Sequence, residues 1–245
     1  MKVCIAQTKS VKGDISANLK NHLRWINVAV AERADLMVFP ELSLTGYEPT
    51  LAQELASGPE DPRWAELQQI SDRHNLTIGV GLPVRSDGGI FIGMLVFQPG
   101  GPPAVYSKQL LHEDELPYFI PGDKPMMLTI KDTTVALAIC YEALQPSHAE
   151  QAHDLGATLY LASVAKAQSG IEKAQRYFPS LATRYALPVL MANGVGFCDN
   201  FESRGQSSVW SAQGQLLGQL HDTDEGLITY DTTTEKIVQQ TTSQA

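Results

Sequence analysis

The alternation of strand and helix patterns along almost the whole chain is the feature that most limits its possible folds. Short apolar, β-branched runs typical of buried strands are separated by segments with helical periodicity. In the segment 16–33, for example, Leu19, Leu23, Ile26 and Val30 fall on one face of a helix. Such a chain is expected to fold as an α/β protein whose helices cover the faces of one or more sheets.

The expected elements follow this alternation. Strands are predicted at residues 2–8, 36–39, 77–82, 91–98, 105–108, 127–130, 135–140, 158–162, 189–192, 207–210, 216–220 and 227–230. Helices are predicted at 16–33, 62–75, 147–155 and 171–185, with Asp61 as the N-cap of the second. Long buried strands combined with late hairpins indicate mixed sheets. No linker or low-complexity tract divides the 245 residues, so we expect one domain spanning residues 1–245.

Charge and composition exclude several classes of protein. A formal net charge of −9 argues against a nucleic-acid partner, which needs a basic face. No apolar run reaches the roughly 18 residues of a membrane span, and the first residues have a strand pattern rather than that of a signal peptide. Three widely spaced cysteines without a Cys-x-x-Cys motif favour a cytoplasmic location. No His and Cys cluster has metal-ligand spacing, so neither a metal nor another cofactor is expected.

Three of the predicted strands lead into side chains of complementary chemistry. Glu41 follows the strand at 36–39, Lys108 ends the strand at 105–108, and Cys140 ends the strand at 135–140. A thiolate is a strong nucleophile that a nearby base can generate, and an ammonium group stabilises a developing negative charge. Together these three residues suggest acyl-transfer chemistry.

The sequence around these residues carries further motifs in a fixed order. They are Phe39-Pro40-Glu41-Leu42, Thr45-Gly46-Tyr47, Tyr106-Ser107-Lys108 and Ile139-Cys140-Tyr141-Glu142, supported by Gln7, Glu115, Phe119, Gly122, Arg184, Asn193 and Gly205. This set, which covers most of the chain, resembles the carbon–nitrogen hydrolase (nitrilase) superfamily with its Glu-Lys-Cys triad. The resemblance implies a four-layer α-β-β-α sandwich with two mixed sheets. It also implies a homodimer or a larger homo-oligomer.

The resemblance also implies a reaction and a role for each residue. Cys140 would attack an amide carbon while Glu41 carries the proton, and Lys108 with the backbone N–H of Tyr141 would stabilise the oxyanion. Glu115 would position the substrate or Lys108. The expected activity is hydrolysis of a non-peptide C–N bond in a small linear amide or N-carbamoyl compound. It would proceed through a cysteine thioester and release ammonia.

Several residues near these motifs are candidates for binding substrate. Tyr47 and Tyr118 either line the pocket or simply pack, and Tyr141 directly follows the cysteine. Glu142 is either a support behind the site or a surface carboxylate. The arginine that many members carry after Cys-Tyr-Glu is absent here. Lys166 is the nearest basic candidate to hold an acid group of the substrate, and its alternative is a solvated loop lysine.

Other functions remain open at this point. Cleavage of a nitrile uses the same triad, and a non-catalytic binding protein on the same fold is a further alternative. A redox sensor based on Cys140 lacks an evident resolving cysteine, because Cys4 lies within a predicted strand and Cys198 in a predicted loop.

Overall fold

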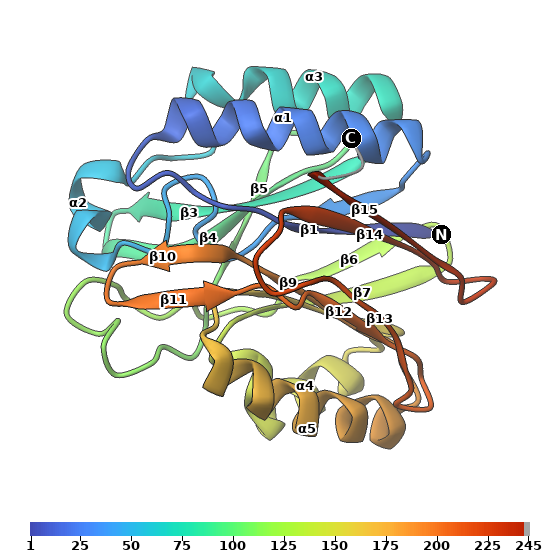
Figure 1. The fold of residues 1–245 in the computed structure, drawn as a ribbon. Helices are drawn as coiled ribbons and strands as arrows, with labels where there is room; N and C mark the ends of the chain where they lie inside the picture. The colour runs from blue at the N-terminus through green and yellow to red at the C-terminus, as the bar shows by residue number, and fades with distance from the viewer. Residues whose placement is uncertain (243–245) are drawn as a thin grey trace.

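Two sheets face each other at the centre of the protein, and helices cover both outer sides (Figure 1). This computed structural model describes residues 1–242, so the last three residues of the predicted domain 1–245 lie outside the described part. Helices α1 (Ile15–Ala31) and α3 (Ala65–His74) form one outer layer, and α4 (Pro146–Asp154) and α5 (Gln168–Tyr185) form the other. The prediction of a four-layer α-β-β-α sandwich is confirmed.

The first sheet contains seven strands in the order β15-β14-β1-β2-β3-β4-β5. Their bounds are β1 Lys2–Gln7, β2 Leu36–Val38, β3 Thr77–Ser86, β4 Gly89–Phe97, β5 Ala104–Ser107, β14 Gly226–Asp231 and β15 Ile237–Thr241. The central strands β1, β2 and β3 are parallel to one another, whereas the outer pairings are antiparallel. The sheet is therefore mixed, as expected.

The second sheet repeats this plan with six strands in the order β13-β12-β9-β8-β7-β6. Their bounds are β6 Met127–Ile130, β7 Thr133–Ile139, β8 Leu159–Val164, β9 Val189–Asn193, β12 Ser208–Trp210 and β13 Leu216–Gln219. Strands β7, β8 and β9 are parallel at its centre, and the edges are antiparallel. In both sheets the carboxyl ends of parallel strands meet at one edge, where functional loops gather.

Three apolar clusters hold the layers together. The largest fills the space between the sheets, with Ile5, Val38 and Leu137 fully or almost fully buried. A second cluster joins the first sheet to α1 and α3, and a third joins the second sheet to α4 and α5. The strands at the sheet centres are buried on both faces, which explains why they are continuous apolar runs rather than alternating ones.

Some segments differ from the sequence-based expectation. The helix predicted from residue 62 is a 3-10 turn, η2 (Pro62–Trp64), followed by α3, and Asp61 does cap its start by accepting a hydrogen bond from the Arg63 N–H. Cys198 lies not in a loop but in a hairpin of β10 (Val195–Cys198) and β11 (Phe201–Arg204). The two-residue connection 199–200 is the length typical of a hairpin and could have revealed it. Strand β15 and the short elements η1 (Pro49–Leu51) and α2 (Ala52–Leu55) were also not predicted.

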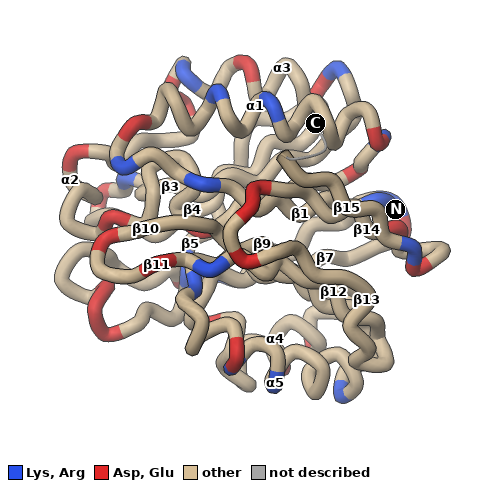
Figure 2. The backbone as a smooth tube through the Cα atoms, in the orientation of Figure 1, with Lys and Arg blue, Asp and Glu red and all other residues tan. Residues whose placement is uncertain are grey.

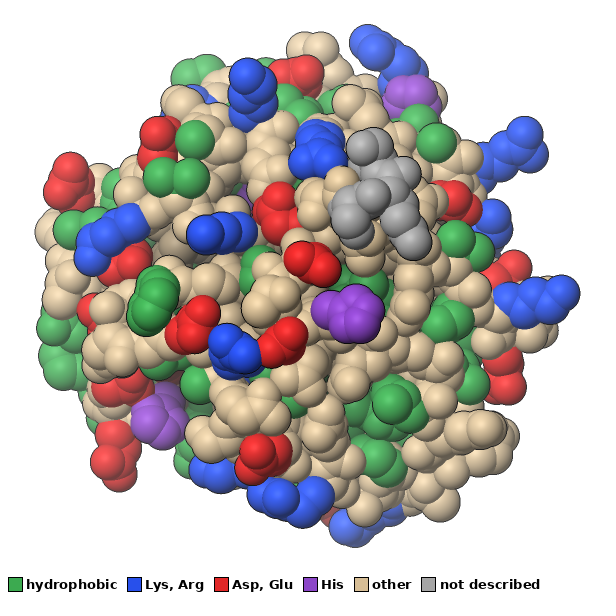
Figure 3. Space-filling view, viewed as in Figure 1, with side chains coloured by type: hydrophobic (Ala, Val, Ile, Leu, Met, Phe, Trp, Pro, Cys, Tyr) green, Lys and Arg blue, Asp and Glu red, His purple; other side chains and the backbone are tan. Residues whose placement is uncertain are grey.

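On the face seen in Figures 2 and 3, acidic and basic residues are interspersed. Figure 2 shows acidic and basic residues interspersed along the helices of both outer layers. The face seen in Figure 3 has the same mixture. Within residues 1–242, no helix is long and apolar enough to cross a bilayer.

Candidate active site

Glu41 lies in a tight turn that follows strand β2. Phe39 continues the pairing with β3 by donating its N–H to the Gly79 carbonyl at 3.0 Å, and Leu42 adopts a positive φ of 51°. Strand β3 passes so close that a Cβ added at Gly81 would lie 2.5 Å from the backbone nitrogen of Leu42. Only glycine fits here without a shift of the turn, so the position of the Glu41 carboxylate depends on Gly81.

Lys108 follows β5 and is completely buried. Its backbone is held on both sides, because its N–H donates to the Ile92 carbonyl at 2.9 Å and its carbonyl accepts from the Gly122 N–H at 2.8 Å. The ammonium group donates to Glu41 Oε1 at 2.8 Å and to Glu115 Oε1 at 2.6 Å. Lys108 is therefore a fixed cation with two carboxylate partners.

Glu115 is held as firmly as the lysine that it contacts. Its Oε1 also accepts a hydrogen bond from the Tyr47 hydroxyl at 2.9 Å, and its Oε2 accepts one from the His112 N–H at 2.7 Å. Burial raises the pKa of Tyr47, so its phenol stays protonated and acts as a donor. The contact with Lys108 favours the predicted alternative in which Glu115 positions that lysine.

Cys140 occupies the sharp turn between β7 and the 3-10 turn η3 (Glu142–Leu144). Its φ is +50°, a conformation that is uncommon for a residue with a side chain and costs about 1–3 kcal/mol. The Cys140 N–H donates to the Ser163 carbonyl at 3.0 Å, which fixes the turn against the neighbouring strand β8. The thiol lies 3.7 Å from the Ala165 carbonyl oxygen. The turn presents sulfur at the end of a buried strand.

Ser163 connects the two halves of this constellation. Its carbonyl accepts from Cys140, and its hydroxyl donates to the Phe39 carbonyl at 2.8 Å, two residues before Glu41. Glu41 comes from the first sheet and Cys140 from the second. One buried residue is thus hydrogen-bonded to both strand ends across the interface between the sheets.

The charges of this cluster shift its titration. Burial, and then the negative charge of Glu41, raise the pKa of the Cys140 thiol to about 11, while Lys166 and Lys108 oppose that shift. Burial also raises the pKa of Glu41, against the attraction of Lys108. For Lys108 burial favours the neutral form, but Glu41, Cys140 and Glu115 together raise its pKa above the ordinary value. The resting thiol is therefore protonated near pH 7, and a base is needed to form the thiolate.

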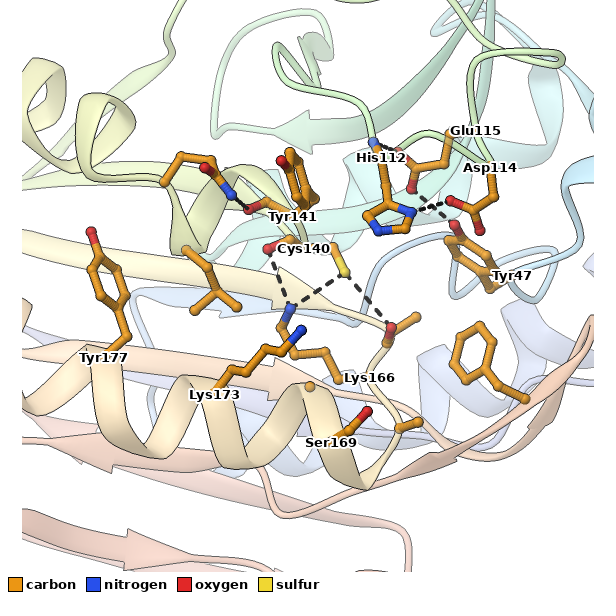
Figure 4. Close-up of a pocket in the computed structure, with 16 residues that line it drawn as sticks. Tyr47, His112, Asp114, Glu115, Cys140, Tyr141, Lys166, Ser169, Lys173 and Tyr177 are labelled. Carbon is orange, nitrogen blue, oxygen red and sulfur yellow. Dashed lines mark hydrogen bonds and ion pairs between the residues drawn. The ribbon is translucent and has the colours of Figure 1, made fainter.

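A cavity of about 480 Å³ opens above Cys140 (Figure 4). Tyr47, Glu115 and Tyr141 line it, whereas Lys108 is completely buried and Glu41 almost so, and neither is part of its lining. Oε2 of Glu41 is buried and takes no hydrogen bond from a protein group in the described part. It is the carboxylate oxygen left free to accept a proton.

Lys166 also lines the cavity, and the predicted alternative of a solvated loop lysine is wrong. The residue is only 6% exposed. Its ammonium nitrogen lies 3.4 Å from the Cys140 carbonyl oxygen and 3.7 Å from Sγ. Its identity as a candidate follows from the sequence, whereas its position beside the thiol depends on the fold.

Two other sequence candidates do not reach the cavity. We correct the prediction that Glu142 binds substrate: its carboxylate is completely buried and accepts hydrogen bonds from the N–H groups of Ile139 and Gln109 and from the Tyr106 hydroxyl. It supports the Cys140 turn from behind. Tyr118 is 41% exposed and is not part of the cavity lining.

The remaining cysteines are not part of the cavity lining. Cys4 is buried in β1 beside the Thr229 hydroxyl, and burial raises its pKa to about 12. Cys198 contacts Ser203 across the β10–β11 hairpin. All three thiols are free, and within residues 1–242 no group of three or more His, Cys, Asp or Glu side chains has the arrangement of a metal site.

A thiol, a buried carboxylate and a buried ammonium group thus meet at the strand ends of an α-β-β-α sandwich. The chain belongs to the carbon–nitrogen hydrolase family, whose sequence model matches residues 2–241. The superfamily resemblance is confirmed by this match.

Similar proteins extend the comparison. The chain is 28% identical over 243 residues to a glutamine-dependent NAD(+) synthetase of Thermotoga maritima; the match covers 94% of this chain but 42% of that protein. It is 29% identical to a Pseudomonas protegens protein named "Hydrolase in pqqF 5'region", covering 93% and 81% of the two chains. The structure matches the NitN amidase of Neterenkonia sp. AN1 with a TM-score of 0.85 and 25% identity, covering 94% and 92%. With 42% coverage, the chain spans less than half the length of the Thermotoga synthetase.

Proposed function

We propose that this protein hydrolyses a small linear amide or N-carbamoyl compound through a thioester on Cys140 and releases ammonia. The observation that carries the proposal is the convergence of Glu41, Lys108 and Cys140 beneath one cavity, with Lys108 Nζ 2.8 Å from Glu41 Oε1. An amide carbon is a poor electrophile, so its cleavage needs a nucleophile, a proton carrier and positive charge near the carbonyl oxygen. These three residues supply that set.

The first half of the reaction forms the thioester. The Cys140 sulfur attacks the carbonyl carbon while its proton passes to Glu41, and the carbonyl oxygen becomes an oxyanion. Lys108 and the backbone N–H of Tyr141 stabilise this negative charge; that N–H makes no hydrogen bond to another described residue. Glu41 then returns the proton to the departing nitrogen, and the C–N bond breaks to give ammonia and an acyl-enzyme.

The second half releases the acid. Water attacks the thioester carbon while Glu41 accepts one of its protons, and the same donors stabilise the second oxyanion. The C–S bond breaks, the sulfur regains a proton from Glu41, and a carboxylic acid leaves. The raised pKa of Glu41 suits a group that alternates between base and acid.

The similar proteins support an amide as the substrate. A cysteine-to-alanine variant of the Nesterenkonia amidase has been solved in complex with butyramide. The Thermotoga synthetase depends on glutamine. Butyramide and glutamine both contain a primary amide group, and we infer that this chain acts on that group as well.

A screen for ammonia release tests the proposal. Primary amides, N-carbamoyl acids and nitriles are incubated with the wild type, with Cys140→Ala and with Cys198→Ala as the matched control. We expect ammonia from an amide or carbamoyl compound, an acyl adduct on the Cys140 peptide, and loss of both in Cys140→Ala only. An amide product from a nitrile would favour the nitrilase alternative, and activity in Cys140→Ala would exclude the mechanism.

We further propose a cytoplasmic location and a homodimer or larger homo-oligomer. The three free cysteines support a reducing compartment. Sedimentation of the purified protein tests the oligomeric state, and fractionation of cells tests the location.

A further inference from the structure

We propose that Lys166 and Lys173 form an anion subsite beside Cys140, so that the preferred substrate is a primary amide or N-carbamoyl compound that also carries a carboxylate. This inference rests on the proposed function and specifies its substrate class. It begins from a buried cation whose counter-charge is absent from the described residues.

The backbone of Lys166 is rigidly placed. Its N–H donates to Asn193 Oδ1 at 2.8 Å, and its carbonyl accepts from Asn193 Nδ2 at 3.2 Å and from the Arg204 N–H at 3.1 Å. Its aliphatic stem crosses the first turn of α5, where a Cβ added at Gly170 would lie 3.3 Å from Lys166 Cβ. The side chain is thus positioned before any ligand arrives.

The ammonium group of Lys166 has no carboxylate partner within the described part of the chain. Its hydrogen bonds go to the Cys140 carbonyl and to the thiol, at 3.4 and 3.7 Å. Lys108, by comparison, contacts two carboxylates within 2.8 Å. A buried ammonium group without a counter-charge is costly, and an anionic ligand would remove that cost.

Lys173 adds a second positive charge to the same wall. It is an exposed residue of α5 that lines the cavity, and it has no ion-pair partner among residues 1–242. Figure 4 shows the side chains of Lys166 and Lys173 extending into the cavity from the α5 side. Although the chain has a net charge of −9, these two lysines make this wall of the cavity positively charged, which favours an anionic ligand.

The acidic groups of the cavity lie elsewhere and already have partners. Glu115 is bound by Lys108, Tyr47 and the His112 N–H, and Asp114 is paired with the His112 ring. A substrate carboxylate would therefore be repelled from that wall and attracted to the lysine wall.

Distances limit the length of the substrate. A carboxylate oxygen at about 2.8 Å from Lys166 Nζ lies within roughly 6.5 Å of Sγ, since Nζ is 3.7 Å from Sγ. The reacting carbon must approach Sγ to about 3–3.5 Å. The carboxylate oxygen and the reacting carbon can then lie at most about 10 Å apart, and succinamate, with a short spacer between its two carbons, fits well within this limit.

Succinamate and butyramide make a matched pair, because they differ by a carboxylate in place of a terminal methyl group. We expect the wild type to have the higher kcat/KM for succinamate. Lys166→Met should lower the ratio of succinamate to butyramide kcat/KM by about 30-fold, mainly through KM. Lys173→Met should lower it by about threefold, because the exposed charge is screened.

Lys20→Met, which removes an exposed lysine from α1 in the opposite layer, is the control and should leave the ratio unchanged. Parallel losses on both substrates in Lys166→Met, or no preference for succinamate in the wild type, would overturn the anion subsite.

Calorimetry with Cys140→Ala separates this inference from the proposed function. Succinamate should bind more tightly than butyramide, and the difference should vanish in Cys140→Ala/Lys166→Met. Tight binding of this kind without ammonia release from any amide by the wild type would reject the proposed reaction and keep the subsite.

Discussion

Two buried lysines influence the charge of Cys140, and their surroundings differ. The Lys108 ammonium is enclosed by Glu41 and Glu115, whereas within residues 1–242 that of Lys166 is hydrogen-bonded only to Cys140. A cation with a complete set of partners can serve a step common to every substrate. A cation without a counter-charge can serve a ligand. With the proposed function and anion subsite, this difference assigns Lys108 to the reaction and Lys166 to the choice of substrate.

The largest expected effect is that of Lys108→Met. It removes oxyanion stabilisation, worth about a hundred- to a thousandfold in kcat, for charged and neutral amides alike. It also leaves two buried carboxylates uncompensated, which should lower the free energy of unfolding by about 3–5 kcal/mol. Steady-state kinetics and urea denaturation measure both. A kcat within threefold of wild type would show that Lys108 does not serve a step common to all substrates.

Gly81→Ala should have the next largest effect. It displaces the turn that carries Glu41 without changing a charged residue. The added Cβ would meet the backbone at Leu42 and Pro40, at 2.5 and 2.8 Å, so the Glu41 turn must move. A shift of about 1 Å can cost roughly a hundredfold in rate. We expect kcat to fall by at least tenfold for both classes of substrate, as measured with butyramide and succinamate. A selective loss on succinamate would contradict the proposed separation.

Lys166→Met should affect stability and thiol reactivity rather than oxyanion chemistry. Removing an unpaired buried charge should leave the free energy of unfolding unchanged or raise it by about 1 kcal/mol, opposite in sign to Lys108→Met. Because the positive charge of Lys166 lowers the pKa of Cys140, its loss should raise that pKa above about 11 and slow alkylation by iodoacetamide at pH 9. Urea denaturation and alkylation rates test both, and an unchanged alkylation rate would show that Lys166 does not influence the thiol.

The smallest effect is expected from Gly170→Ala. Its Cβ would press on the stem of Lys166 at 3.3 Å, a contact that a small movement of the side chain relieves. We expect KM for succinamate to rise a few-fold with kcat for butyramide within twofold of wild type. An equal change for both substrates would show that the α5 contact does not control the lysine.

Much of the cluster around Lys108 could be predicted from sequence, because its side chains lie at the ends of secondary-structure elements. Glu41, Lys108 and Cys140 each come at the end of an apolar run, and such runs identify themselves as buried strands. The four layers follow from the same alternation together with the family resemblance. The extent of the domain and the catalytic roles of the residues stay predictions until the variants are measured.

The buried position of Lys166 could not be predicted in the same way. A lysine in a loop is usually solvated, and the burial of Lys166 depends on distant segments: Asn193 at the end of β9, Arg204 in the β10–β11 hairpin, and Gly170 in α5. The hairpin itself was expected to be a loop. The buried position of Glu142 likewise depends on Gln109 and Tyr106, which are more than 30 residues away in the chain.

The two hydrogen bonds of Ser163 have a consequence for how the protein can change over time. Glu41 and Cys140 follow strands of different sheets, so their mutual alignment depends on the packing between those sheets rather than on either strand alone. Packing changes anywhere along the interface between the sheets can therefore alter turnover without altering a residue of the cavity. Natural variation in the inter-sheet core is therefore a means of tuning rate that leaves the lining of the cavity unchanged.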